Sequence, residues 1–249
     1  MRKFLIAALA AVAAISFSAV ALGQATDTAE LTVNVTPKKA GKKNKPKNSA
    51  FDLEVVNQNT KRTMSDLDIF MPKNVKLNLK GIPSCSRDDI ALKSCPESTE
   101  LGEGTAEAMA GVNGAAPLPL SFVVTAFKTK SLDAQGNVSN KDMLGFFIDG
   151  PGSLDFLTET KLTKARGKYG QKLHIDVPDA AQRTGSTSYN GLVSLEIDDL
   201  GKKKGRNMLV SSTGCVKRKH PYKVDLTFID NGVTDATTIS DTANAGCRK

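Results

Sequence analysis

The sequence predicts an all-β protein: an antiparallel β-sandwich of the immunoglobulin or jelly-roll kind, with about a dozen short strands and one short disulfide-clamped helix. Apolar and polar residues alternate in short segments that are separated by Gly, Pro and Asn turns. No segment keeps a helical period for three turns. This pattern fits either two packed antiparallel sheets or one sheet closed on itself, and we expect the sandwich.

The N-terminus has the pattern of a secretory signal peptide. The basic start Met1-Arg2-Lys3 precedes an uncharged run from Phe4 to Leu22, and small residues follow at Gly23 and Ala25. We expect residues 1–25 to be cleaved. The alternative is a retained membrane anchor, because nineteen uncharged residues can just span a bilayer. No second hydrophobic span follows, so residues 26–249 are predicted to form a single extended β-sandwich domain without an integral membrane segment.

The strands can be read from the alternation in chain order. Leu31, Val33 and Val35 alternate with polar residues, as expected for a half-buried strand. The segment from Met143 to Ile148 is apolar on both faces, as expected for a central strand. The remaining strands are predicted at 51–55, 66–71, 75–79, 118–128, 154–163, 172–177, 192–198, 207–211 and 222–229, with a weak strand at 105–110.

One short segment between the strands is predicted to be helical. Ser86 and Asp89 are spaced as in a capping box, and Pro96 prevents the helix from continuing. Lys93 lies near the end, where a cation suits the exposed carbonyl groups. A helix of about two turns is too short to be stable alone. A bridge between Cys85 and Cys95 would close its ends.

Four cysteines in an exported chain imply two disulfides, with three possible pairings. The Asn231-Gly232 dipeptide follows an alternating strand and predicts a tight hairpin turn. Cys215 lies sixteen residues before Asn231 and Cys247 sixteen after it, so the hairpin brings these two cysteines side by side. We therefore predict Cys215–Cys247 and Cys85–Cys95 disulfides.

Several segments resemble a family of exported actinobacterial β-sandwich proteins of uncharacterised function. They are Phe70 to Val75, Gly81 to Cys85, the Cys-Pro-Glu-Ser-Thr-Glu-Leu-Gly-Glu-Gly stretch from Cys95 to Gly104, the Lys-Pro-rich loop and the closing Cys-Arg-Lys. The resemblance implies a secreted sandwich with two local disulfides, and it implies no activity. Cys215 is followed here by Val-Lys-Arg-Lys, where the family suggests Pro-Lys-Gly, so this loop is more basic than usual.

The sequence carries no catalytic motif, and we expect a protein that is not an enzyme. The only two histidines, His174 and His220, are expected on the surface, and neither a Gly-x-Ser-x-Gly elbow nor a His-Glu-x-x-His pair occurs. Carboxylate pairs such as Asp176 with Asp179 lack the dense spacing of a calcium loop. No catalytic, metal or cofactor site is therefore predicted. A glycan or ester hydrolase with carboxylates from distant strands is the alternative.

Clusters of basic residues in predicted loops are the strongest remaining signal. Chain charge is +8, and three such clusters occur. Their members are Lys38, Lys39, Lys42, Lys43, Lys45 and Lys47 in the first, Lys202, Lys203, Lys204 and Arg206 in the second, and Lys217, Arg218 and Lys219 in the third.

Grouped at one end of a sandwich, these clusters would form a positive surface for an anionic envelope or extracellular polymer. Nucleic acid is disfavoured, because aromatic residues are not interleaved with the basic ones. The competing interpretation is that charged loops serve solubility and protect edge strands. A third possibility is a structural module that pairs with a protein partner through a sheet edge.

Overall fold

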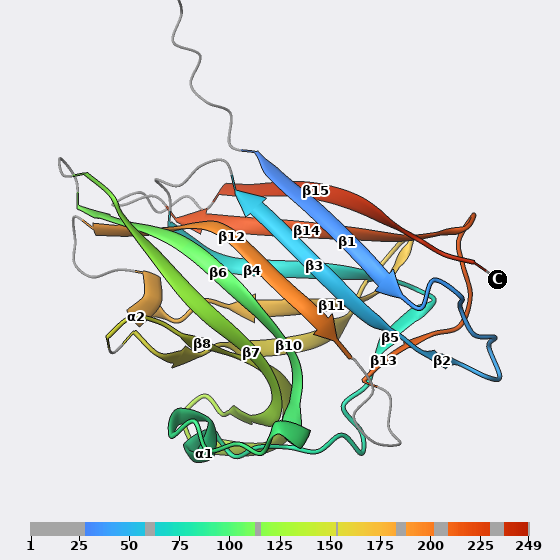
Figure 1. Cartoon of the computed structure of the whole chain (residues 1–249), viewed down its shortest axis with the longest axis horizontal. Helices are drawn as coiled ribbons and strands as arrows, with labels where there is room; N and C mark the ends of the chain where they lie inside the picture. The colour runs from blue at the N-terminus through green and yellow to red at the C-terminus, as the bar shows by residue number, and fades with distance from the viewer. Residues whose placement is uncertain are drawn as a thin grey trace, which may run out of the picture.

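The computed structural model describes residues 28–57, 63–112, 116–152, 154–182, 188–201, 209–229 and 237–248. It confirms the predicted all-β, antiparallel sandwich (Figure 1). The predicted signal peptide and the Asn231-Gly232 turn lie outside the described residues. The helices found in the described part of the chain are short: α1 (Arg87–Ala91), the 3₁₀ turn η1 (Glu97–Thr99) and α2 (Asp179–Gln182).

The larger layer is a seven-stranded antiparallel sheet. Its strands, in spatial order, are β1 (Ala29–Thr36), β3 (Ala50–Asn57), β12 (Ser188–Leu200), β6 (Glu100–Val112), β7 (Leu118–Leu132), β8 (Val138–Asp149) and β9 (Phe156–Leu157). Strands β6, β7 and β12 are 13, 15 and 13 residues long, longer than the short strands that the sequence suggested.

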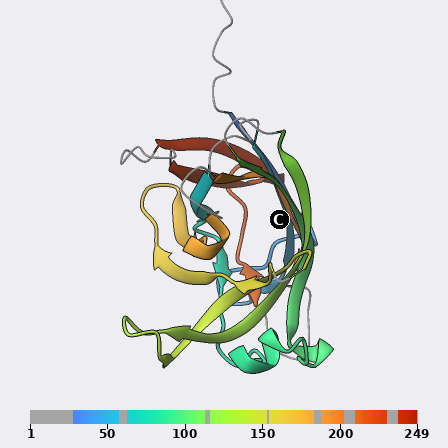
Figure 2. The same ribbon diagram turned by 90° about the vertical axis from the view of Figure 1, so that its left-hand side faces the viewer.

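The opposing layer is a five-stranded sheet, and a small third sheet lies beside it. The five-stranded sheet contains β10 (Glu159–Lys164), β11 (Tyr169–Asp176), β4 (Thr63–Pro72), β14 (Lys219–Ile229) and β15 (Thr237–Gly246). The third sheet contains β2 (Lys47–Asn48), β13 (Val210–Ser212) and β5 (Val75–Leu77). The two large sheets curve around a common interior (Figure 2).

The core forms where the inward faces of the two large sheets meet. In β14 every second residue is buried, and Tyr222 and Phe228 are fully inaccessible to solvent. The facing strand β3 contributes Phe51, whose ring centroid lies 6.1 Å from that of Tyr222. Period-two alternation places the other residues of each strand on its outer face, so the same pattern that predicts the strands also builds the core.

The two large sheets also bond to each other along both lateral edges. On one side, the backbone N–H of Leu31 in β1 donates to Oδ2 of Asp241 in β15 at 2.8 Å. On the other side, the N–H of Thr158 donates to the carbonyl of Phe146 in β8 at 2.9 Å, and Thr160 Oγ1 donates to the carbonyl of Leu144. Backbone groups at these edges therefore find partners in the opposite sheet.

Two further differences concern the predicted strands at 154–163 and 105–110. The segment predicted as one strand at 154–163 divides at Thr158 into β9 and β10, which belong to different sheets. The weak strand expected at 105–110 is part of the long strand β6, which pairs with β12 and β7 along its length. A Cβ at Gly104 would lie 1.9 Å from the carbonyl oxygen of Glu196, so this glycine permits the close pairing of β6 with β12.

Helix α1 begins as predicted and is shorter than predicted. Ser86 is its N-cap: its hydroxyl accepts from the Asp89 N–H at 3.0 Å and donates to Asp89 Oδ2 at 2.6 Å. The Cys85–Cys95 disulfide is present and closes the segment. Lys93 has a φ of 54°, and its ammonium group contacts Asp149 instead of the helix carbonyls. Cys85 packs with Ile90, Phe127 and Phe147 in a small separate cluster.

We predict that replacing both Cys85 and Cys95 by Ala lowers the free energy of unfolding by about 3 kcal/mol, because the open chain gains loop entropy. Urea denaturation monitored by circular dichroism measures this change. Tryptic peptides around α1 should be released first, since this segment packs only in its own small cluster. A double variant as stable as the parent would show that the cluster orders the segment without the bridge.

Candidate functional site: the basic end of the sandwich

A disulfide between Cys215 and Cys247 fixes one end of the β14–β15 hairpin. The bond is present as predicted, with 5.7 Å between the Cα atoms. Lys219 at the start of β14 pairs with Gly246 at the end of β15, directly beside the bridge. The N–H of Cys247 also donates to the carbonyl of Arg218 at 2.9 Å. The chain on either side of the disulfide is therefore held in a defined position.

Lys217 and Arg218 form the tip of a tight turn next to this disulfide. Val216 and Lys219 exchange two backbone hydrogen bonds, of 3.0 and 2.8 Å, across the turn. Lys217 and Arg218 have φ angles of 48° and 64°. Two positive φ angles are typical of a type I′ turn, which favours Asn and Gly at these positions. Two long cationic side chains thus occupy backbone positions that are sterically unfavourable for them.

The C-terminal segment brings the first basic cluster to the same place. The backbones of Lys39 and Arg248 pair in an isolated parallel β-bridge. The N–H of Ala40 donates to the carbonyl of Arg248 at 2.8 Å, and the N–H of Arg248 donates to the carbonyl of Lys38 at 2.6 Å. Residues from the start and the end of the described chain therefore lie side by side, at the right-hand end of Figure 1.

The rest of the first cluster continues from this point as an exposed loop. Lys42 and Lys45 exchange backbone hydrogen bonds of 2.9 and 3.0 Å, which makes the loop a second tight turn. Gly41 packs closely against the chain: an added Cβ would lie 2.5 Å from the Lys47 nitrogen and 2.7 Å from the Ser212 carbonyl oxygen. The loop is thus fixed at its base while the side chains of Lys42, Lys43, Lys45 and Lys47 are exposed.

An open depression of about 780 Å³ lies around the Cys215–Cys247 disulfide. Among the described residues that line it, four are cationic and none is acidic; the four are Lys38, Lys217, Arg218 and Arg248. All four are exposed, and none forms an ion pair with another described residue. These four residues form the basic end of the sandwich together with Lys39, Lys42, Lys43, Lys45, Lys47 and Lys219.

Several cations elsewhere on the two sheets are neutralised by carboxylates. Lys128 and Lys130 both contact Asp142, at 2.9 and 2.6 Å. Lys172 contacts Asp68 at 2.8 Å, and the same pairing with a neighbouring carboxylate occurs for Lys93, Lys223 and Arg87. Exposed lysines such as Lys141 also form no ion pair with another described residue, so what distinguishes the basic end is that several such cations converge on one depression.

The structure brings together two of the three basic clusters predicted from the sequence. The first and third meet at the basic end. The second cluster, Lys202 to Arg206, lies outside the described residues. Arg248 was not singled out from the sequence. Its signal was its position next to Cys247, because the predicted disulfide already placed that cysteine beside Lys217 and Arg218.

His220 lies behind the basic end and is buried, which corrects the expectation of a surface histidine. Its side chain is 1% exposed, and Nδ1 lies 3.1 Å from Nδ2 of Asn74. Asn74 also donates to the carbonyl of Gly214, next to Cys215. Burial lowers the pKa of His220 below its ordinary value of 6.5. The alternation in β14 places His220 on the inward face, together with Tyr222 and Val224.

His174 lies on the outward face of β11, within a network of carboxylates. Its Nδ1 lies 2.7 Å from Asp68, and its Nε2 lies 2.8 Å from Asp176 and 3.6 Å from Asp66. One atom each of Asp66, His174 and Asp176 could bind a metal ion, since these atoms lie within 4.8 Å of one another. These side chains already have partners in one another and in Asp68, as a histidine–carboxylate network. Asp176, which the sequence offered with Asp179 only as a disfavoured calcium-ligand pair, contacts His174 here.

Comparisons with known protein families, curated proteins and solved structures find no match for this chain. The resemblance to exported actinobacterial proteins therefore stays a prediction. In the described part of the chain, no helix is long and apolar enough to cross a membrane.

We predict that replacing Lys217 by Asn and Arg218 by Gly raises the free energy of unfolding by about 1 to 2 kcal/mol, because both residues then suit positive φ. Urea denaturation measures the gain. The matched control replaces both residues by Gln, which removes the charges and retains the unfavourable backbone. The control should show a smaller gain, which comes from relief of charge repulsion alone. A gain of equal size in both variants would contradict the strain argument.

We predict that the protein loses stability as pH falls below about 6.5, in part through His220. The pKa of His220 is lowered in the folded state, so the unfolded chain binds a proton first and acidification favours unfolding. The free energy of unfolding, measured between pH 7.5 and pH 5, should fall less steeply in a His220→Gln variant. The His174→Gln variant is the matched control and should retain the contribution of His220 to the slope.

Proposed function

We propose that this chain is an exported, non-catalytic β-sandwich protein that binds an anionic envelope or extracellular polymer at its basic end. The observation that carries the proposal is the depression around the Cys215–Cys247 disulfide, with four exposed cations and no acidic residue in its described lining. Export is supported by the signal-peptide pattern at residues 1–25 and by the two disulfides, which are typical of oxidising compartments.

The geometry of the basic end supports a polymer as the ligand in preference to a small anion. The depression is open, and the exposed lysines of the loop from Lys42 to Lys47 extend the positive surface beyond it. A polymer with repeated charges can contact several such cations at once, and each contact adds affinity by displacing counterions. The guanidinium groups of Arg218 and Arg248 can bind phosphate, sulfate or carboxylate with two hydrogen bonds.

The described lining of the depression contains no aromatic residue. Bases of single-stranded nucleic acid stack on aromatic side chains, so this surface offers charge without a stacking platform. An acidic polysaccharide or a polyol phosphate polymer needs only charge and hydrogen bonds. We therefore favour these polymers over nucleic acid as the ligand.

The two alternative functions receive less support from the described residues. A partner module would need a free sheet edge. The edges of β1 and β15 bond to each other through Leu31 and Asp241, so among the described strands a partner would have to use a short free edge such as the part of β7 before Val123. A glycoside hydrolase would need two facing carboxylates in a cavity. The apolar cavity between the sheets has one carboxylate, Asp155, in its described lining.

We predict that the full, oxidised protein sediments with purified cell envelopes at low salt and is released at high salt, because ions screen exposed charges. Replacing Lys217 and Arg218 by Gln should weaken binding several-fold and make it less dependent on salt. Defined polymers serve as further ligands: a poly(glycerol phosphate), dextran sulfate and duplex DNA. Because these polymers are soluble, they are coupled to beads for the sedimentation assay, and free protein is determined in the supernatant.

The matched control replaces Lys141 and Lys161 by Gln, which removes the same number of positive charges. Both side chains are exposed and lie on β8 and β10, strands that contribute no residue to the basic end. If the control variant still sediments with envelopes and the Lys217/Arg218 variant does not, binding is located at the basic end. Equal behaviour of the two variants, or no sedimentation at low salt, would contradict the proposal and leave solubility as the role of the charges.

A further inference from the structure

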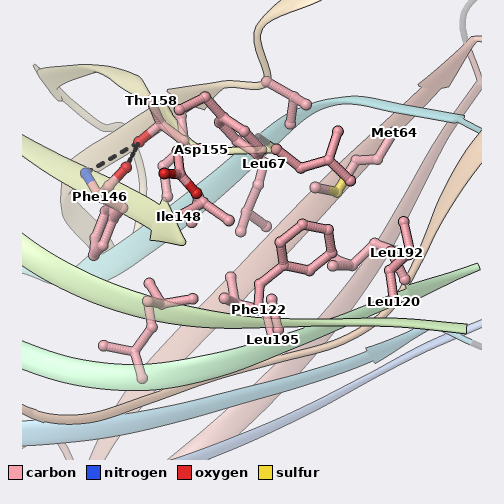
Figure 3. Close-up of a pocket in the computed structure, with 18 residues that line it drawn as sticks. Met64, Leu67, Leu120, Phe122, Phe146, Ile148, Asp155, Thr158, Leu192 and Leu195 are labelled. Carbon is pink, nitrogen blue, oxygen red and sulfur yellow. Dashed lines mark hydrogen bonds between the residues drawn. The ribbon is translucent and has the colours of Figure 1, made fainter. Parts of the chain in front are cut away.

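A cavity of about 200 Å³ lies between the two large sheets, far from the basic end. Figure 3 shows side chains from both sheets pointing into it, among them Met64 and Leu67 from β4, Phe122 from β7, and Phe146 and Ile148 from β8. Protein interiors are densely packed and contain few voids larger than a water molecule. This cavity is larger than the engineered cavity of about 150 Å³ that binds benzene.

Among the described residues that line the cavity, all are apolar except Thr158 and Asp155. Both hydrogen bonds of the Thr158 hydroxyl are made to the backbone of β8. It accepts from the N–H of Phe146 at 3.1 Å and donates to the carbonyl of Phe146 at 3.2 Å. Asp155 is exposed at the rim. The interior therefore presents hydrocarbon surface to any molecule that enters it, and water finds few partners there.

The cavity opens where the edge bonding between the sheets stops. Strand β8 ends at Asp149, which pairs with Val123, so the preceding residues of β7 pair only with β6. Leu118, Leu120 and Phe122 lie on the inward face of this free part of β7, and they are exposed or half-buried. Leu154 is 38% exposed on the loop opposite. Leu120, Phe122 and Leu154 line the cavity, and we take them as its entrance.

Among the described residues, two carboxylates and one ammonium group lie together at the rim of the entrance. Lys93 Nζ lies 2.8 Å from Asp149 Oδ1 and 3.2 Å from Asp155 Oδ2. The N–H of Gly150 donates to Asp155 Oδ1 at 3.2 Å. The hydrogen bonds from Lys93 and Gly150 lower the pKa of Asp155, so it is ionised at neutral pH. Lys93 contacts both carboxylates and balances the charge of one. These three rim groups together therefore carry one negative charge in excess.

We propose that this cavity is a binding site for an uncharged, mainly aliphatic ligand, whose apolar part enters between the sheets past Phe122 and Leu154. The apolar lining supplies the affinity by removing hydrocarbon from water. The excess negative charge at the rim disfavours a ligand with a carboxylate head group, such as a fatty acid anion. An alcohol or a hydrocarbon of the same length meets no such repulsion.

The test uses the full, oxidised chain and the neutral fluorescent probe N-phenyl-1-naphthylamine, which brightens in an apolar site. The probe should bind, and 1-decanol should displace it at a concentration several-fold lower than decanoate. Replacing Asp155 by Asn should reduce the difference between the two ligands. Failure of the probe to bind would overturn the proposal. Displacement by decanoate as effective as by decanol would overturn the preference for an uncharged ligand.

Two variants place the binding in the cavity. Ala106 is buried and lines the cavity from β6, so Ala106→Phe should fill it and weaken probe binding at least tenfold. The matched control is Val123→Phe, which adds a ring on the exposed outer face of β7 and should leave binding unchanged. Equal binding in both variants would overturn the proposal.

A variant that enlarges the cavity serves if Ala106→Phe does not fold. Phe122→Ala removes a half-buried ring at the entrance, so the best competitor in a series of alcohols should become longer, from decanol toward dodecanol. An unchanged order of alcohols would contradict a site behind Phe122. Melting temperature with and without decanol gives an independent reading, because a ligand of the folded state raises it.

Discussion

The hairpin of β14 and β15 joins the core of the sandwich to its basic end, and much of the structure depends on how it is held. Its inward face supplies Tyr222 and Phe228, which are fully buried against the opposite sheet. Its first residues continue into the turn of Lys217 and Arg218. The Cys215–Cys247 disulfide lies between these two parts. Burial fixes the direction of the hairpin, and the disulfide fixes the position of the charged turn beyond the core.

This arrangement explains how the basic end tolerates its own charge. Like charges in proximity repel, and left-handed backbone at Lys217 and Arg218 adds a further cost. Neither cost is relieved by a carboxylate among the described neighbours. The disulfide and the backbone bonds of Arg248 and Cys247 compensate by making the local chain rigid. A surface selected only for solubility does not need rigidity or unfavourable turn residues, whereas a binding surface benefits from both.

Much of the fold could be predicted because alternation is a local signal. The burial pattern of β1 follows Leu31, Val33 and Val35 as expected, and the equal spacing of Cys215 and Cys247 about Asn231 gave the right disulfide. The order of strands in the sheets could not be predicted, because it depends on contacts between distant segments. The division at Thr158 was missed for the same reason: its hydroxyl and N–H bond to β8 only once the two sheets face each other.

For the basic end and the cavity, too, the local features could be predicted from the sequence, and the contacts between distant segments could not. Basic clusters are visible as runs in the sequence, but their convergence required the bridge between Lys39 and Arg248. The residues of the cavity looked like ordinary core residues, since Leu120 and Phe122 alternate as any inward face does. What distinguishes them is that β8 stops at Asp149 and leaves their part of β7 paired with β6 alone. No property of β7 alone carries that information.

The two proposed sites lie at opposite ends of the same strands, and this separation makes them physically independent. Strand β4 begins at Thr63, and its second residue, Met64, lines the cavity; ten residues later, or about 30 Å along the chain, Asn74 lies behind the basic end. Strand β11 runs the other way and ends beside Val177 at the cavity. A polymer held at the basic end would leave the cavity entrance open on the far side. Binding at one end can therefore fail in experiment without bearing on the other.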